Sequence, residues 1–244
     1  MSGIEASDIK MYNSKSTAAA DGESSPDGLG GYRSSVVITD DEFENLFDNV
    51  GSAESDTGDT EYRAFFFRNE HLTLTLEAAR VFLYTGVPMT DLTTGLIEGG
   101  SETTLYVTSN ADFPDYGAVF VEDEEIRYTG KNSTTELTGC TRGSNSTTKA
   151  AHAIGTKVEH HKISFATEDP GTPNTNPIQT IANESTAPSG VSWSQAQTYT
   201  DGQVIGDLAP DEKYGVWIKR QVPLGCGPKA TIYITIKIQG DTQE

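Results

Sequence analysis

Residues 230–240 read ATIYITIKIQG, and this run alternates between apolar and polar side chains. Successive side chains of a β-strand point to opposite faces, so one face of this strand is apolar and the other polar. The apolar face holds Ile232, Ile234, Ile236 and Ile238. The runs YRAFFFRNE, LTLTLEAARVFLYT, KISFAT and YGVWIKRQV are similarly rich in β-branched and aromatic residues, and Gly/Pro/Asn/Asp clusters separate them. The pattern predicts a mainly β protein built on an antiparallel β-sandwich.

One short amphipathic helix is expected before the strands begin. In TDDEFENLFDNV, Thr39 fits an N-cap and Glu42 fits its capping-box partner. Phe43, Leu46 and Phe47 have i, i+3, i+4 spacing, which makes one apolar face. These three residues are our candidate assembly contacts. The run GSAESDTGDTE after them is expected to be a linker, and no helix-length apolar period appears after residue 50.

Composition along the chain suggests four parts. Residues 1–34 are rich in Gly, Ser, Asp and Ala and poor in apolar residues, so they form an arm that is either disordered or laid against something else. Residues 35–60 hold a short strand, the helix and the linker. Residues 61–97 and 162–244 form the sandwich. Residues 98–161, whose strands are short, are expected to be a small β-barrel-like module inserted into a sandwich loop, a position that tolerates insertion.

Charge and cysteine content exclude several functions. The formal net charge of −19 is opposite to what nucleic-acid phosphates or anionic membranes attract. The two cysteines, Cys140 and Cys226, fit no metal-ligand spacing, so neither a metal nor another cofactor is expected, and the sequence leaves their state open. No apolar run approaches a membrane span and none follows a basic start, so the chain is expected to be made in a cytoplasm.

The stretch LTGCTRGSNSTTKAAHAIGTKV brings together residue types found in nucleophilic sites. Cys140 could use His152 as a base, but no third, orienting group is evident. The spacing of Cys140 and Arg142 is too tight for a cysteine-phosphatase loop. We therefore expect no catalytic residues and no enzymatic activity from this stretch.

A structural interpretation of the same stretch is favoured. Gly139 and Gly143 bracket a turn that needs unusual backbone angles. The planar guanidinium of Arg142 suits loop carbonyls or a carboxylate such as Glu125. His152 could close the module through a side-chain hydrogen bond. These four residues, Gly139, Arg142, Gly143 and His152, are the predicted determinants of the module fold.

Three other features have a plain and a functional interpretation. His160 and His161 are adjacent, and adjacent strand residues point to opposite faces, so they are not expected to share a metal ion. The run EDEE at 122–125 is expected to be a solvated hairpin turn, with cation binding and acid–base hydrolysis as alternatives. Trp193 is expected to pack at the sandwich edge, with stacking on a sugar ring as the alternative.

The module sequence resembles a small β unit that recurs in structural proteins of tailed phages. The shared pattern runs from FPDYG through EIRYTG and LTGCTRG to HAIGTKV. The matching positions are Phe113, Pro114, Gly117, Glu125, Ile126, Tyr128, Thr129, Gly130, Leu137, Thr138, Gly139, Thr141, Arg142, Gly143, Thr148, Ala150, His152, Gly155 and Val158. The flanking runs EYRAFFFRNEHLTLTLEAARVFL and IGDLAPDEKYGVWIKRQVPLG are similar to phage virion proteins with an immunoglobulin-like sandwich.

The resemblance implies a non-enzymatic structural component of a tailed-phage virion. Its partners would be capsid, neck or tail subunits and further copies of itself in a ring or lattice. The N-terminal arm and the predicted helix would dock on a neighbouring subunit, with the neck, tail or baseplate side favoured. The alternatives are a capsid decoration protein and a host-facing module that binds carbohydrate or a receptor. The resemblance leaves head, neck or tail placement, copy number and host open.

Overall fold

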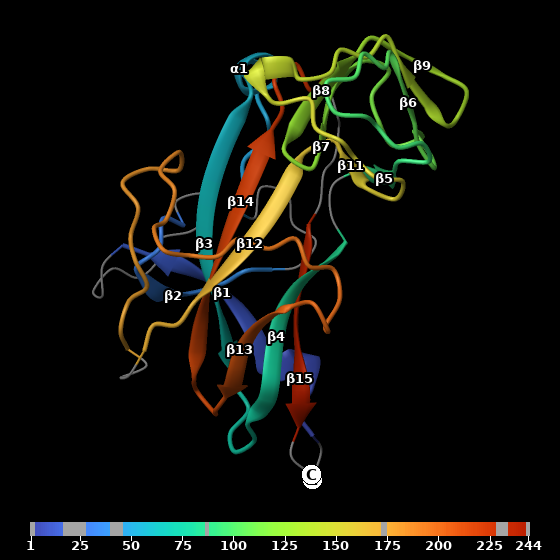
Figure 1. Cartoon of the computed structure of the whole chain (residues 1–244). Coiled ribbons are helices and arrows are strands. Elements are labelled where there is room, and N and C mark those ends of the chain that lie inside the picture. The colour runs from blue at the N-terminus through green and yellow to red at the C-terminus, as the bar shows by residue number, and fades with distance from the viewer. Residues whose placement is uncertain are drawn as a thin grey trace.

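The computed structural model describes residues 3–16, 28–39, 46–85, 88–171, 175–227 and 234–242, and it is mainly β (Figure 1). The long strands form a sandwich, and the short strands form a module beside one end of it. The helical elements are short: η1 (Ala6–Asp8), α1 (Ser52–Thr57) and η2 (Ser144–Ser146).

Two antiparallel sheets make the sandwich, as the alternating sequence predicts. The five-stranded sheet has the order β12-β14-β3-β1-β2 and the three-stranded sheet the order β13-β4-β15. The strands of the first are β12 (Lys162–Glu168), β14 (Lys213–Val222), β3 (Asp59–Asn69), β1 (Ile9–Lys15) and β2 (Tyr32–Val37). Those of the second are β13 (Gln203–Leu208), β4 (Leu76–Thr85) and β15 (Thr235–Thr242). The mainly β class and the sandwich are therefore confirmed.

The run Phe65-Phe66-Phe67 in β3 explains how the five-stranded sheet is held. Phe65 and Phe67 face the core between the two sheets, where the partly buried Ile234, Ile236 and Ile238 also pack. Phe66 points to the opposite face and packs with Trp217 under the segment that contains Ile178 and Ile181. Both faces of β3 and β14 are thus buried. A strand buried on both faces is typically a continuous apolar run rather than an alternating one. Ile232 lies outside the described residues.

The N-terminal arm belongs to the sandwich. The described parts of the arm, residues 3–16 and 28–34, are laid against the sandwich, because β1 lies between β3 and β2 and pairs with both. Met11 packs against the inner core. The Arg33 guanidinium lies over the Tyr12 ring, 4.5 Å from the ring centroid. The boundary at residue 34 is therefore wrong: the arm supplies an internal strand of its own chain's sheet.

Only the end of the segment expected to be a helix lies within the described residues. Residues 40–45, including Phe43, lie outside the described residues. Leu46 and Phe47 form a bend, and Phe47 is buried in the sandwich core between the guanidiniums of Arg63 and Arg220. Phe47 is thus used by its own chain rather than presented to a neighbouring subunit.

The only α-helix of the described residues, α1, forms within the expected linker. The Gly51 backbone N–H donates to a Glu54 carboxylate oxygen at 2.5 Å, which caps the first turn. The helix ends at Gly58, whose φ of 72° lies in the left-handed region that glycine adopts without strain. The cap therefore supports a short helix in a segment whose composition is typical of a linker.

The module comprises two small sheets around one core. Their orders are β5-β11-β7-β8 and β6-β10-β9. The strands are β5 (Met89–Asp91), β6 (Thr104–Tyr106), β7 (Gly117–Val121), β8 (Glu124–Tyr128), β9 (Gly130–Asn132), β10 (Glu136–Thr138) and β11 (Lys157–Glu159). β5 pairs with β11, and Leu92 and Leu96 lie in the module core. The module therefore begins near residue 88, and the expected start at residue 98 is wrong because it cuts off β5.

Three chain segments meet where the sandwich joins the module. Asp59 at the start of β3 pairs with Val222 at the end of β14, and Lys162 at the start of β12 pairs with Gln221. The residues just beyond these strand ends, namely α1, the bend at 160–161 and the loop at 223–227, therefore lie at one end of the sheet. Figure 1 shows this end beside β7 and β8. We call it the junction.

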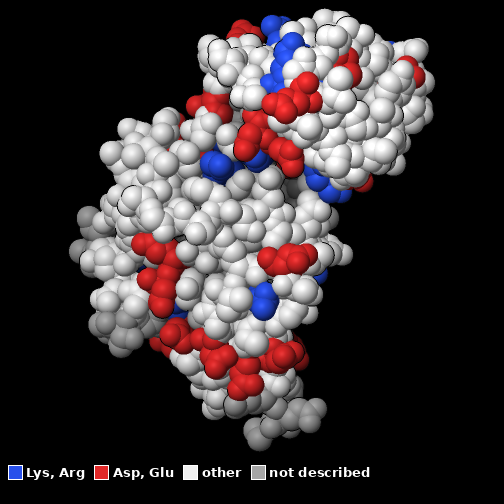
Figure 2. All heavy atoms as spheres, viewed as in Figure 1, with Lys and Arg blue, Asp and Glu red and all other residues white. Residues whose placement is uncertain are grey.

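Surface charge is uneven on the face shown in Figure 2. Acidic side chains gather over the end of the sandwich far from the module and again at the junction. The far end includes the exposed Asp207 and Asp241, since β13 and β15 both end beside Leu76. The face of the module in this view is mostly uncharged.

Removing residues 1–16 should destabilise the whole sandwich, because β3 loses its neighbour and the inner core loses Met11. Burial of a large apolar side chain contributes about 1.5–3 kcal/mol, so we expect a loss of several kcal/mol in the free energy of unfolding by urea. Lys10→Ala is the control, since the exposed Lys10–Glu70 ion pair is worth at most about 1 kcal/mol. A truncated chain as stable as the control would contradict the assignment of β1.

Candidate functional site

The two glycines singled out in the sequence hold the turn that the module needs. Gly139 and Gly143 have φ of 63° and 64°. A Cβ at Gly139 would lie 2.0 Å from Thr129 Oγ1, and one at Gly143 would lie 2.9 Å from the Thr147 carbonyl oxygen. Both the backbone angle and the space therefore require glycine, as predicted.

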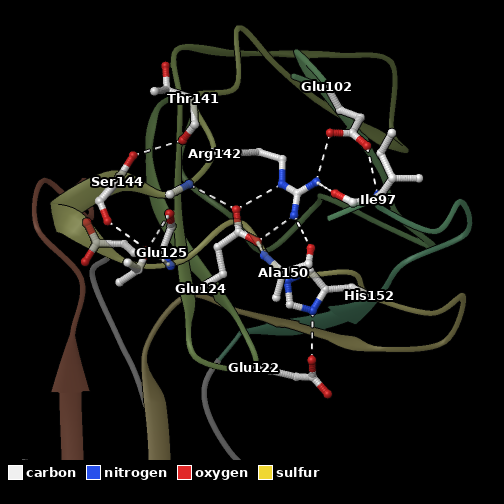
Figure 3. A network of polar contacts seen from close by, with 12 residues as sticks. Ile97, Glu102, Glu122, Glu124, Glu125, Thr141, Arg142, Ser144, Ala150 and His152 are labelled. Atoms are coloured by element: carbon white, nitrogen blue, oxygen red, sulfur yellow. Dashed lines mark hydrogen bonds and ion pairs between the residues drawn. The ribbon is translucent and has the colours of Figure 1, made fainter. Parts of the chain in front are cut away.

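The turn places Arg142 inside the module, with a fully buried side chain (Figure 3). Its Nε and Nη2 donate to the two oxygens of Glu124 at 2.9 and 2.7 Å, a bidentate pair. Nη1 donates to Glu102 at 2.9 Å and to the Ile97 carbonyl at 2.7 Å, and Nη2 also donates to the Ala150 carbonyl. Arg142 thus joins three separate loops of the module.

Glu124 is the acceptor at the centre of this network. Besides the two bonds from Arg142, it accepts from the backbone N–H groups of Gly143 at 3.0 Å and Ala150 at 3.1 Å. Burial opposes ionisation of this carboxyl, but the hydrogen bonds from Arg142 and His152 outweigh it and hold the pKa of Glu124 below its ordinary value. The result is a buried, ionised carboxylate with a full set of donors.

His152 closes the network from the other side. Its Nε2 lies 2.8 Å from a Glu124 oxygen, and its Nδ1 lies 2.8 Å from an oxygen of the exposed Glu122. The backbone of His152 also pairs with Leu96, so the ring is fixed by the sheet as well as by the carboxylates. His152 thus makes side-chain contacts of the kind expected for closing the module. We call Arg142, Glu124, Glu102, His152 and Glu122 the clasp.

The partner of Arg142 differs from the expected one. Glu125 was the expected carboxylate partner, but the guanidinium binds Glu124 and Glu102. Glu125 Oε2 instead lies 3.4 Å from Asn145 Nδ2. Neighbouring residues of β8 face opposite sides, which places Glu124 toward the clasp and Glu125 away from it. Glu122 lies in the turn before β8 and contacts the same His152 ring as Glu124. The expectation of a solvated EDEE turn is correct only for Glu122 and Asp123, because Glu124 and Glu125 are buried.

Cys140 lies in the module core rather than in a reactive site. Its Sγ donates to the Leu137 carbonyl at 3.2 Å, and burial raises the pKa of the thiol to about 11. At neutral pH the group is therefore a thiol, whereas nucleophilic attack needs a thiolate. Both ring nitrogens of His152, the expected base, face carboxylates.

Trp193 is partly buried and contacts side chains of its own chain. The Tyr62 ring lies 5.6 Å from it, and the Lys219 ammonium lies 5.2 Å from its centroid. It packs against the outer core of the five-stranded sheet. This is the packing role expected for Trp193.

The structure brings together one set of side chains that the sequence kept apart. His160 and His161 lie at the junction, in the bend between β11 and β12, so strand alternation does not apply to them. Their rings stack, with centroids 4.6 Å apart. Cys226 lies beside them, and one potential ligand atom from each of the three lies within 4.8 Å of the others. Cys226 is far from the two histidines in the sequence, so no local sequence pattern predicts this cluster.

Replacing Arg142 with Met should destabilise the protein strongly, because Glu124 would stay buried without its cation. Breaking a buried pair in this way costs about 3–5 kcal/mol. Arg127→Met is the matched control, since the exposed Arg127 lies on the same strand as Glu124 and a surface change costs within about 0.5 kcal/mol. Urea unfolding measures both, and equal losses would show that the clasp does not hold the module.

The stability that Glu102 provides should depend on pH in the acid range. Burial opposes its ionisation, but the Ile97 N–H and the Arg142 guanidinium outweigh it and lower the pKa of Glu102 from 4.5 to about 2. An acid with a lowered folded pKa stabilises the fold above its unfolded pKa and loses this effect as the pH falls through the folded pKa. The melting temperature of the wild type should therefore exceed that of Glu102→Gln at pH 6, and the gap should close toward pH 2. A gap that is constant with pH would contradict this role.

Comparison of the chain with protein-family models, curated proteins and solved structures found no match. Within the described part of the chain, no helix is both long and apolar enough to span a membrane. What can be said of function therefore comes from the residues themselves and their arrangement.

Proposed function

We propose that this chain is a non-enzymatic structural component of a tailed-phage virion. The observation that carries the proposal is the clasp. Arg142 and His152, which belong to the sequence pattern of the phage structural module, are used to hold the module closed. The residues that carry the resemblance thus have the roles that a structural module requires.

The potentially reactive groups of the module support the same function. Cys140 is a buried thiol, Arg142 is saturated by carboxylates and carbonyls, and His152 lies between two carboxylates. A catalytic group needs access to a substrate and a free position for proton transfer. In the clasp, Arg142 and His152 bind carboxylates, and Cys140 packs in the core nearby, so these groups contribute to stability.

Surface charge bears on the kind of partner. The acidic side chains at the far end of the sandwich and at the junction disfavour nucleic-acid phosphates (Figure 2). A protein partner with basic or uncharged surface fits better. Neighbouring virion subunits, including further copies of this chain, are therefore the proposed partners.

Because β1 and Phe47 are internal, we propose a contact surface on another part of the chain. The module offers Ile97 and Ile154, which are 68% and 69% exposed. They lie on two segments that are paired through Leu96 and His152, directly outside the clasp. We propose that this rim of the module contacts the neighbouring subunit, with the neck or tail side of the particle favoured over capsid decoration.

Immunogold labelling of tailed particles from lysates that contain this protein tests the proposal. Antibody against the full chain should label particles at a fixed position, and the position distinguishes head, neck and tail. The double variant Ile97→Asp/Ile154→Asp should fold but be lost from particles, whereas Leu72→Asp, at another exposed apolar side chain, should be incorporated normally. Unlabelled particles beside abundant free protein would contradict a structural role in the virion.

A further inference from the structure

The junction gathers nitrogen and sulfur ligands from parts of the chain that are distant in sequence. Lys162 of β12 pairs with Gln221 of β14, which sets the residues before β12 beside those after β14. These residues include His160, His161 and Cys226, whose side chains are at most 1% exposed. Burial of three polar side chains in one place costs free energy unless their polar atoms find partners.

The hydrogen bond of His160 fixes which of its nitrogens can bind a cation. Its Nε2 lies 3.0 Å from the Cys226 carbonyl oxygen. A carbonyl only accepts, so Nε2 carries the proton and the lone pair of the neutral ring is on Nδ1. An imidazole whose second nitrogen donates to a backbone carbonyl is the arrangement typical of metal-binding histidines.

Among the residues that the structure describes, His161 has no hydrogen-bond partner on either ring nitrogen, although both nitrogens are buried. Burial, together with the nearby His160 and Arg220, lowers the pKa of His161 well below its ordinary value, so the ring is neutral. A neutral buried imidazole with an unused lone pair is costly to the fold. A metal ion bound to that lone pair would remove the cost.

Cys226 adds the softest ligand of the three. Its Sγ lies 3.3 Å from Ser55 Oγ in α1, and burial raises the pKa of the thiol. The carboxylates of Asp56 and Glu125 act on the same thiol, so the charge around it favours a cation. When the thiol binds a divalent metal it loses its proton to solvent, and the new bond is between the metal and the thiolate.

We propose that His160, His161 and Cys226 bind one divalent transition-metal ion of the zinc class. Imidazole and thiolate select such ions over Mg²⁺ and Ca²⁺, which prefer oxygen. Tetrahedral zinc with Zn–N near 2.0–2.1 Å and Zn–S near 2.3 Å separates two nitrogens and one sulfur by about 3.3–3.6 Å. One ring nitrogen of each histidine and the Cys226 sulfur lie within 4.8 Å of one another, so modest side-chain rotation brings the ligand atoms to that spacing.

The position of the site indicates its role. His160 and His161 lie on the chain that leaves the module, and Cys226 lies on the loop that follows β14 of the sandwich. A metal bound to all three would tie the module to the sandwich. It would add to the stability of the folded chain in proportion to its binding free energy.

A second cluster at the junction, Asp48, Glu54 and Glu61, does not carry the same inference. Glu61 accepts from the Arg220 Nε at 2.6 Å, and Asp48 lies 3.5 Å from Arg220 Nη2. Glu61 and Asp48 therefore have a cation already, and Glu54 accepts from the Gly51 N–H.

Cobalt(II) is the probe, because a thiolate bound to it gives a charge-transfer absorption band and a tetrahedral site gives intense visible bands. The full chain, unfolded with a chelator and refolded with Co²⁺, should bind one cobalt per chain with both kinds of band. Added Zn²⁺ should abolish the bands and raise the melting temperature relative to the metal-free chain. A refolded wild-type chain that binds no cobalt, or binds it without the thiolate band, would overturn the proposal.

Variants identify the ligands. Cys226→Ser should lose the thiolate band, and His161→Ala should weaken cobalt binding about 100-fold or more, since loss of even an outer-shell partner costs roughly 10–100-fold. Cys140→Ala and His71→Ala are the matched controls and should keep both the bands and the affinity. Circular dichroism shows whether each variant folds. Retention of the band in a folded Cys226→Ser chain, or its loss in a folded Cys140→Ala chain, would overturn the assignment.

Discussion

The antiparallel pairing of β3 with β14 is the constraint on which the rest of the structure depends. It runs unbroken from Asp59↔Val222 to Arg68↔Lys213, and both of its faces are buried. Phe65 and Phe67 anchor the facing sheet on one side, while Phe66 and Trp217 hold the covering segment on the other. Because β1 and β12 pair with the outer edges of this pair, its register also decides which residues meet at the junction.

Buried charge shapes the module in a different way. The Arg142–Glu124 pair is removed from water on both sides, and such a pair stabilises a fold only when every donor and acceptor is satisfied. Here the remaining guanidinium hydrogens go to Glu102 and two backbone carbonyls. An alternative arrangement of these loops would leave charges unpaired in the module core, so the clasp favours one loop arrangement as well as adding stability.

Alternation and turn glycines made much of the fold predictable. The sandwich follows from runs such as ATIYITIKIQG, and the roles of Gly139, Gly143, Arg142 and His152 follow from their spacing in one stretch. Local sequence patterns did not predict the structure of segments whose conformation depends on contacts with distant parts of the chain. The arm has too few apolar residues to indicate a strand by itself, yet β3 offers it a complete edge.

The junction was the least predictable part, and for a physical reason. Adjacent histidines diverge on a strand, but a bend between β11 and β12 lets the rings of His160 and His161 stack. Cys226 reaches them only through strand register, which no local pattern contains. The sequence analysis did not identify Glu102 for the same reason: its carboxylate accepts from Arg142, which lies on a loop distant in sequence.

We infer that the clasp holds the module closed and that the junction holds the module against the sandwich, so that the chain tumbles as one body. Backbone ¹⁵N relaxation of the full chain tests this inference, since it reports the rotational tumbling of each amide. We expect a single rotational correlation time for amides of β3 and β14 and for amides of β7 and β8. A shorter correlation time for the module strands would show a module that moves independently and would contradict the claim.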